Sequence, residues 1–546
     1  MKKRFLSILL LIPLLFFSCI EENQTEKENV KLIKDGSAFS LIVDGEPFIM
    51  LGGELGNSTA AHIDNMKDVW PRLKAMKLNT ALVPVYWELI EPDEGQFDFK
   101  LVEDLIVEAR KNDIKLVFLW FGSWKNSMSC YAPLWVKQDW ERFPRAFSKD
   151  GTPQEIMTPF SKENLETDKK AYLALLNHIA EFDKNDRTVI MMQIENEIGM
   201  IPDARDYCSM ANEAFFSEVP EQLKNMVESG NMISEHITNL WNKNNSPKNG
   251  NWEEMFGKNL FTDELFMTWY YALYVEELAK EGKEVYDLPV YLNAALNSRG
   301  RAPGAYPSAG PLAHLIDIWR AVSPSVDFIA PDIYDPGFAN WCSQYDVPGI
   351  NPLFIPEIRN EDGNDARVFY ALGAHNALGF SPFSIEDTPN PENAPLTKSY
   401  EVLHQLLPLI VKKQVEGKIS GVLFYEDVKD TTITFGNYKF NISHDYTLGW
   451  SPKANDGSKW PETGALILQM SDDEFIVAGT GVVLTFESIE ESIGRTGIGE
   501  IDRIKNINGE FIPTLRLNGD QNHQGRHLRI PQGDYDIQKL TLYRYY

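Results

Sequence analysis

The sequence has few cysteines, no basic stripe and only one long apolar run. Its 546 residues include 4 cysteines without CxxC spacing, which indicates neither a disulfide framework nor a zinc site. The formal net charge is −27, and lysines and arginines form no cluster, so nucleic acid is not an expected partner. Hydrophobic residues make up 43% of the chain, which argues against a disordered protein. The sequence therefore predicts an acidic globular protein, with no metal and no organic cofactor indicated.

The single long apolar run lies at the N-terminus. Residues 1–19, MKKRFLSILLLIPLLFFSC, combine a basic start with an apolar stretch that is short for a membrane span. This segment resembles a bacterial lipoprotein signal, which implies cleavage before Cys19 and lipid attachment to its thiol. Residues 20–36 are interpreted as an acidic tether. We expect a cell-envelope protein held by this anchor at the outer membrane, either periplasmic or surface-exposed; a plain cleavable signal is the alternative.

Residues 37–410 alternate β-rich runs with stretches of helical periodicity, which is the pattern of βα units. In residues 100–111, for example, apolar side chains recur at helical spacing. Eight apolar runs each become polar at their C-terminal end: 48–57, 79–92, 114–124, 188–199, 288–297, 326–335, 352–361 and 378–387. Eight strands with interleaved helices predict a (β/α)8 TIM barrel. The stretch at about 203–285 is too long for one connection and is interpreted as a helical insertion beside the barrel mouth.

The pattern of residue types changes after the predicted barrel. Residues 411–546 are rich in short strand-like runs separated by turn residues, such as TTITFGNYKFNIS and EFIVAGTGVVLTFES. This pattern predicts an all-β domain, and a sandwich is the expected arrangement. The fold class is therefore α/β, a TIM barrel followed by a C-terminal β-sandwich.

Carboxylates gather where the predicted barrel strands end, which is where barrel enzymes carry their chemistry. The polar residues at these ends are Glu54, Glu88, Asn126, Glu195, Asn196, Glu197, Asn293, Tyr334, Glu357 and Glu386. Without a set of His and Cys beside them, they favour acid/base chemistry or sugar binding over a transition metal. Retaining glycosidases place two carboxyl groups about 5–5.5 Å apart. The ends of strands four and seven, IENE and IPEIRNE, lie across the mouth from each other and supply such a pair.

The glutamate of strand seven is Glu357, but IENE offers two candidates. Glu195 and Glu197 share strand parity, so alternation does not choose between them. Glu197 is nearer the mouth and is the preferred residue.

Three motifs resemble glycoside hydrolase family 35, a family of β-galactosidases. QIENEIG resembles its acid/base motif, LNTALVPVYWELIEPDEGQFDF its second-strand region and GGE its first strand. The tail from residue 418 resembles the short β-domain of a bacterial branch of the family. Some members of that branch remove galactose from plant xyloglucan.

The resemblance implies roles for individual residues. Glu197 corresponds to the general acid/base, Glu357 to the nucleophile, Asn196 to the residue that holds the 2-hydroxyl and Tyr334 to the partner of the nucleophile. Glu54, Glu88 and Trp124 are further candidates for contacts with the galactose hydroxyls and ring. Asn126, in GSWKNSM, replaces the usual Asn-Ala-Glu element, and Ile198 replaces the usual aromatic residue after ENE.

These observations predict a lipid-anchored, retaining exo-β-galactosidase that removes terminal galactose from plant-type oligosaccharides or polysaccharides such as xyloglucan. Its expected partner is the carbohydrate substrate, and the oligomeric state is not indicated. One alternative is the same mechanism on another β-glycoside, such as an arabinoside or a glucoside. A second alternative is a non-catalytic surface lipoprotein that binds glycans.

Overall fold

The structure is a computed structural model that describes residues 30–297, 300–490, 494–517 and 519–545. The predicted signal segment, residues 1–19 with the lipidation residue Cys19, lies outside the described residues, as does most of the predicted tether. Within the described residues, no helix has both the length and the apolarity needed to cross a bilayer.

Eight parallel strands close into a barrel, which confirms the predicted fold class. In chain order they are β4 (Met50–Glu54), β5 (Thr80–Tyr86), β6 (Lys115–Lys125), β9 (Val189–Asn196), β10 (Val290–Ala295), β11 (Phe328–Ile333), β12 (Ile355–Ile358) and β13 (Gly379–Pro382). Seven of these strands lie within the predicted apolar runs, and β6 extends one residue beyond its run. Strand β13 pairs with β4 and closes the ring, so the C-terminal ends of all eight strands meet at one mouth.

Helices cover the outside of the barrel. The helices of the βα units and their short companions are α1 (Ile63–Ala75), α2 (Trp87–Ile90), α3 (Lys100–Lys111), α4 (Leu134–Gln138), α5 (Lys162–Phe182), α10 (Leu260–Val285), α11 (Ile316–Val322), α12 (Phe338–Tyr345), α13 (Asn364–Ala374), α14 (Pro395–His404) and α15 (Leu407–Val415). The apolar stripe of α3 is buried through Val102, Leu105, Ile106 and Ala109. A small hairpin of β7 (Arg145–Phe147) and β8 (Pro153–Met157) precedes α5.

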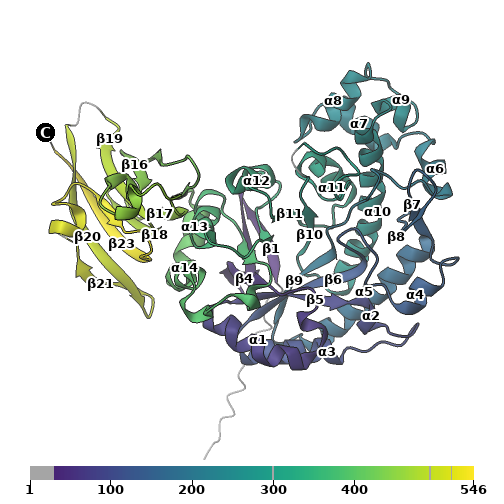
Figure 1. Cartoon of the computed structure of the whole chain (residues 1–546), viewed down its shortest axis with the longest axis horizontal. Helices are drawn as coiled ribbons and strands as arrows, with labels where there is room; N and C mark the ends of the chain where they lie inside the picture. The colour runs from purple at the N-terminus through teal and green to yellow at the C-terminus, as the bar shows by residue number, and fades with distance from the viewer. Residues whose placement is uncertain (1–29, 298–299, 491–493, 518, 546) are drawn as a thin grey trace, which may run out of the picture.

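The long connection between β9 and β10 holds a helical lobe. It consists of α6 (Ser209–Phe215), α7 (Glu221–Ser229), α8 (Glu235–Lys243) and α9 (Trp252–Phe256). Helix α10, which the sequence interpretation had included in the insertion at 203–285, packs against α5 and α11 as a barrel helix. The inserted lobe therefore ends before α10 begins, and its helices α7, α8 and α9 lie at the upper right of Figure 1, away from the barrel strands.

An antiparallel sheet precedes the barrel and was not predicted. It is formed by β1 (Lys31–Asp35), β2 (Ala38–Val43) and β3 (Glu46–Phe48). The interpretation of residues 20–36 as a tether is wrong for β1, because Lys31–Asp35 pairs with β2. Most residues of β1 are exposed, as is usual for a strand at the edge of a sheet. Its polar sequence therefore resembles that of a linker.

The C-terminal region is an antiparallel sandwich. One sheet has the order β14-β17-β18-β23-β20-β21 and the other β15-β16-β19-β22. The strands are β14 (Ile419–Phe424), β15 (Asp430–Phe435), β16 (Tyr438–His444), β17 (Thr463–Gln469), β18 (Glu474–Thr480), β19 (Val482–Ser488), β20 (Arg495–Ile507), β21 (Glu510–Arg516), β22 (Leu528–Ile530) and β23 (Asp536–Tyr545). Their inner faces form a separate apolar core that includes Phe440 and Phe475.

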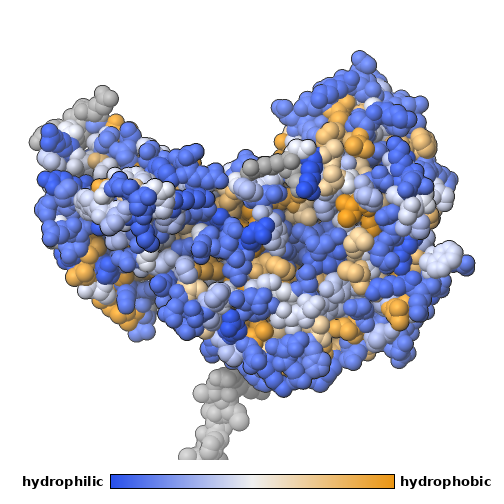
Figure 2. Space-filling view, in the orientation of Figure 1, coloured by the Kyte–Doolittle hydropathy of each residue, from blue (hydrophilic) through white to orange (hydrophobic). Residues whose placement is uncertain are grey.

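The sandwich is joined to the barrel through helix α13, which follows the strand that carries Glu357. A Cβ on Gly373 would lie 2.7 Å from the carbonyl oxygen of Ser420, and a Cβ on Gly421 would lie 2.7 Å from the backbone nitrogen of Ala374. Backbone therefore meets backbone with no space for side chains. In Figure 2 the outline of the molecule is notched between the sandwich and the helical lobe, with the barrel below and between them.

Candidate active site

Glu197 and Glu357 come together at the mouth of the barrel. Glu197 directly follows β9, and Glu357 lies in β12. Carboxylate oxygens of Glu197, Glu357 and a third acid, Asp332 of β11, all lie within 4.8 Å of one another. The exposed fractions of Glu197 and Glu357 are only 5% and 4%. The two predicted catalytic residues thus form part of one nearly buried acidic group.

The backbone around Glu197 explains why alternation did not distinguish it from Glu195. Both residues have left-handed backbone angles, with φ of 57° at Glu195 and 45° at Glu197. Such angles are unfavourable for residues other than glycine and are concentrated at functional sites. They break the regular alternation of the strand, so the two side chains enter different surroundings.

Glu195 belongs to a buried hydrogen-bond network behind the mouth. Its carboxylate accepts hydrogen bonds from the backbone N–H groups of Ser123 (3.1 Å) and Trp124 (2.6 Å). Asp168 of α5 continues the network by accepting from the indole of Trp120 at 2.9 Å and from the hydroxyl of Ser123 at 2.6 Å. Because its oxygens are used by the fold, Glu195 has a structural role.

Glu197 has the surroundings of a general acid. The side-chain amide of Asn126 donates to its Oε2, and its own backbone N–H donates to Asn293 Oδ1 at 3.0 Å. Burial, followed by the negative charge of Glu357, raises the pKa of Glu197 to about 7. A carboxyl group with this pKa can give up and take back a proton near neutral pH.

Glu357 is oriented by Tyr334. The Tyr334 hydroxyl donates to Glu357 Oε1. Burial and the adjacent charge of Glu357 raise the pKa of Tyr334 well above its usual value, so the hydroxyl remains a donor. Glu357 Oε2 is buried and has no hydrogen-bond partner within the described residues. This second oxygen is therefore available for a substrate.

Glu54 and Asn196 complete the predicted part of the site. Glu54 ends β4 and is fully buried; burial and then the charge of Glu357 raise its pKa well above the usual range. Asn196 accepts a hydrogen bond from Lys125 Nζ at 2.8 Å through its Oδ1. Its Nδ2 is buried without a partner among the described residues, which leaves a donor for a sugar hydroxyl.

Asp332 and Lys125 were not predicted. Asp332 accepts from Asn293 Nδ2 at 2.7 Å, and burial together with the charges of Glu357 and Glu197 raises its pKa well above normal. Asp332 lies two residues before Tyr334 and so faces the same side of the strand. A carboxylate within an apolar run is costly to bury, and this is the sequence signal that could have identified it. Lys125 ends β6, one residue beyond the expected end of that strand, and its positive charge lowers the pKa values of Glu54 and Glu197.

Two predicted sugar contacts are not brought into this group. Trp124 is fully buried, its indole donates to the carbonyl of Met157 at 3.1 Å, and the rings of Tyr271 and Tyr274 pack against it. The prediction of a sugar platform at Trp124 is wrong, because the core covers its ring. Glu88 lies on α2, where its carboxylate is 3.5 Å from Lys137 Nζ.

Glu386 also has a structural partner at the mouth. Its Oε1 accepts from the backbone of Gly56 at 2.9 Å and from the hydroxyl of Thr59 at 2.5 Å. It thereby ties the end of β13 to the loop after β4.

The acidic group could hold either protons or an oxygen-liganded cation, because Glu197, Asp332 and Glu357 are close enough to share one. Burial and the charges of the neighbouring carboxylates raise the pKa values of Glu54, Asp332 and Glu197, so protonation is one way to relieve their repulsion and a shared cation is the other. Protonation removes the mutual repulsion without a metal, and it leaves one acid ready to donate.

Comparison with known proteins gives two family matches. Residues 61–291 match the glycoside hydrolase family 42 model, described as β-galactosidase, and residues 396–529 match a domain of unknown function, DUF5597. Residues 61–291 thus resemble a family 42-like β-galactosidase domain that includes Glu197 and ends before Tyr334 and Glu357. The motif resemblance had named family 35, which these matches do not show.

Two curated relatives align with part of the chain. A β-galactosidase of Xanthomonas manihotis is 27% identical over 179 residues, 30% of this chain and 26% of that protein. The β-galactosidase BgaA of Clostridium cellulovorans is 27% identical over 168 residues, 30% of this chain and 24% of that protein. The chain therefore spans about a quarter of the length of these curated relatives.

Solved structures with similarity to the chain include two further β-galactosidases. The enzyme from the haloarchaeon Halorubrum lacusprofundi gives a TM-score of 0.45 at 15% identity, covering 65% of this chain and 58% of that one. The enzyme from Bacillus circulans sp. alkalophilus gives a TM-score of 0.46 at 15% identity, covering 67% and 57%.

Proposed function

We propose that the protein is a retaining exo-β-galactosidase. The observation that carries this proposal is the meeting of Glu197 and Glu357 within 4.8 Å at the mouth of a closed barrel. Retaining glycosidases hold their two carboxyl groups about 5–5.5 Å apart, whereas inverting enzymes need about 6.5–9.5 Å to admit a water molecule. The short separation therefore supports double displacement.

The surroundings of the two residues support distinct roles. Glu197, with its pKa of about 7, protonates the glycosidic oxygen while the free Oε2 of Glu357 attacks the anomeric carbon. The bond to the aglycone breaks and a galactosyl-enzyme ester forms on Glu357. Glu197, now ionised, takes a proton from water, which attacks the ester and releases galactose with its original anomeric configuration.

The proposed sugar specificity depends on the motif resemblance, on the β-galactosidase family model that residues 61–291 match and on the β-galactosidases to which part of the chain is similar. Exo action is also part of the proposal and follows from the motif resemblance. Membership of family 35 and a plant-type substrate such as xyloglucan are part of the proposal.

The test combines a substrate panel with the stereochemistry of the product. The full chain is assayed on nitrophenyl β-galactoside, β-glucoside and arabinosides, and proton NMR follows the first-formed anomer. We expect a preference for the galactoside and release of the β-anomer. Release of the α-anomer would overturn the retaining mechanism, and preference for another glycoside would overturn the sugar assignment. Saturable binding without hydrolysis across the panel would identify a glycan-binding protein instead.

We also propose that the protein is lipid-anchored through Cys19 at the outer membrane. The support is the sequence of residues 1–19. Full-length protein expressed in a bacterial host should fractionate with membranes and incorporate labelled fatty acid, whereas Cys19→Ser should lose both properties. Labelled fatty acid in the Cys19→Ser variant would refute the assignment.

A further inference from the structure

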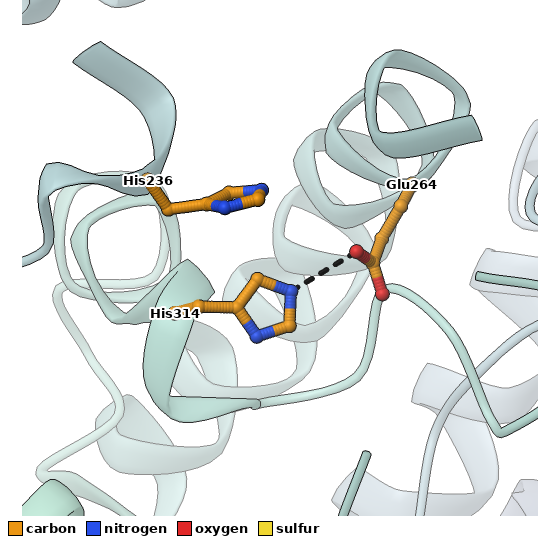
Figure 3. A group of neighbouring side chains, drawn as sticks. All are labelled: His236, Glu264 and His314. Atoms are coloured by element: carbon orange, nitrogen blue, oxygen red, sulfur yellow. Dashed lines mark hydrogen bonds and ion pairs between the residues drawn. The ribbon is translucent and has the colours of Figure 1, made fainter. Parts of the chain in front are cut away.

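A second group of ionisable side chains lies outside the proposed catalytic site. It consists of His236 on α8, Glu264 on α10 and His314 in a short 3-10 helix, Ala313–Leu315, between β10 and α11. One possible ligand atom from each residue lies within 4.8 Å of the other two. Figure 3 shows both imidazole rings beside the carboxylate of Glu264, each side chain coming from a different segment of the chain.

Glu264 is the centre of this group. Its side chain is fully buried, and within the described residues its only ion-pair partner is His314, whose Nε2 lies 3.0 Å from Oε2. No lysine or arginine of the described part of the chain pairs with it. A buried carboxylate is stabilised by a cation, and a metal ion shared with the two histidines would supply one.

His236 offers a lone pair that the fold does not use. Its Nε2 is buried and has no hydrogen-bond partner among the described residues. Neutral imidazole is the form that binds metal ions. Its ring centroid lies 4.8 Å from that of His314.

The carboxylate is also held in place from behind. Glu264 Oε1 accepts the hydroxyl of Tyr306 at 2.9 Å and the backbone N–H of Ala309 at 3.3 Å. These bonds leave Oε2 directed at His314. Metal-binding carboxylates are typically oriented by such outer partners, whose loss weakens binding about 10–100-fold.

We propose that His236, Glu264 and His314 bind a first-row divalent transition metal of the zinc type. Two imidazoles and one carboxylate are a donor set that zinc accepts in proteins, with a fourth position left for water or another ligand. Both histidines line a cavity of about 410 Å³, which supplies space for that fourth ligand. The sequence did not suggest the site, because its ligands lie far apart along the chain and follow no motif spacing.

The bound ion would fasten the inserted lobe to the barrel. It would link α8 of the lobe to α10 and to the connection after β10. The same cavity is lined by Asn297 and Arg301, which follow β10, and by Trp341 of α12. The site therefore stands beside the barrel mouth, and its occupancy is separate from the acid/base chemistry proposed above.

The test is metal binding by the full chain after removal of metals with a chelator. Zn²⁺ is titrated by calorimetry, and Co²⁺ is followed by its visible absorption, which reports coordination geometry directly. We expect one ion per chain and binding at least about 100-fold weaker in His236→Ala and His314→Ala. His523→Ala is the matched control, because the ring of His523 also lies against that of a second histidine, His527, with the two centroids 5.6 Å apart. It should bind as wild type does.

Tyr306→Phe keeps all three ligands and removes only the hydrogen bond to Glu264, so it guards against loss of folding in the histidine variants. Its affinity should fall about 10-fold with the Co²⁺ spectrum retained. The proposal is overturned if the wild type binds no stoichiometric ion, or if both histidine variants bind as tightly as it does. Because the readout is binding, failure of the galactosidase assay leaves this test unaffected.

Discussion

Two groups of buried carboxylates differ in how their oxygens are used. Glu195 and Asp168 accept hydrogen bonds from backbone, indole and hydroxyl donors of the fold. In the group at the barrel mouth, Glu54 and Glu357 have buried oxygens with no hydrogen-bond partner within the described residues. Both groups are desolvated, but only the second has acceptors left for a ligand.

The difference separates a structural role from a catalytic one more clearly than burial or a raised pKa does. Burial raises the pKa of Glu195 as well as that of Glu197. What distinguishes Glu197 is its neighbour, since a second carboxylate across the mouth can act as a nucleophile. Unused hydrogen-bonding capacity beside a second acid therefore identifies the reacting group.

The largest expected effect is on turnover in Glu357→Gln. Removal of the nucleophile should lower kcat/KM on an aryl β-galactoside by at least about 10³-fold, because no galactosyl-enzyme can form. The fold should remain, since the amide oxygen still accepts from Tyr334. Steady-state kinetics and circular dichroism together check this. Turnover near the wild-type value would show that Glu357 is not the nucleophile.

Glu197→Gln should lower kcat by about 10²–10⁴-fold on a galactoside with a poor leaving group, because the departing oxygen is no longer protonated. The loss should be smaller for the first step with an activated nitrophenyl leaving group, which needs little protonation. In the wild type, kcat/KM should decline as pH rises through about 7, where Glu197 loses its proton. A decline that persists in Glu197→Gln would assign that titration to another group.

The same variant should change how stability depends on pH. The pKa of Glu197 is raised in the folded state from 4.5 to about 7. Folding therefore favours the protonated carboxyl group. The resulting contribution to the free energy of unfolding is fully present below pH 4.5 and is lost as pH rises through 7. The free energy of unfolding of Glu197→Gln, measured relative to wild type, should therefore rise by at most about 3 kcal/mol between those pH values. Urea unfolding at pH 4.5 and pH 8 measures the difference, and a gain at the acid end would contradict it.

In the structural group, Asp168→Asn should cost about 1–3 kcal/mol of unfolding free energy, because the amide places a donor against the donors of Trp120, Ser123 and Tyr274. The kcat of the folded enzyme should change little. Asp332→Asn is the matched comparison: its oxygen still accepts from Asn293, and loss of a like charge should preserve stability while turnover falls. Equal effects of the two changes on stability would remove the distinction between the groups.

The smallest effect is expected at Trp124. Trp124→Phe should lower the unfolding free energy by about 1–2 kcal/mol, because the Met157 carbonyl loses its donor and the core loses volume. KM for the galactoside should remain within about twofold. A large rise in KM with unchanged stability would restore the sugar platform that the sequence suggested.

Much of the architecture could be predicted from the chain because each barrel strand is an apolar run that ends in polar residues. The pairing of Glu197 with Glu357 followed from the convergence of parallel strand ends. The choice between Glu195 and Glu197 could not be derived from alternation, because it depends on left-handed backbone angles at both residues. Trp124 was misassigned because a tryptophan at a strand end has the same sequence context whether it faces a sugar or the core.

Other features lacked a sequence signal of their own. Strand β1 is polar and exposed, so its residues resembled a linker. Helix α10 followed a long insertion without a break in composition and was grouped with it. The three residues of the proposed metal site are brought together only by tertiary structure.

The contact between α13 and the sandwich limits how this chain can be rearranged. Gly373 and Gly421 bring two backbones together without intervening side chains. The barrel therefore depends on a sandwich strand that has glycine at the point of contact. If this barrel were fused to a different domain, that domain would need a strand with glycine at the same position. Otherwise helix α13, which follows the strand of Glu357, would be pushed outward. Exchange of the sandwich would then displace the proposed nucleophile.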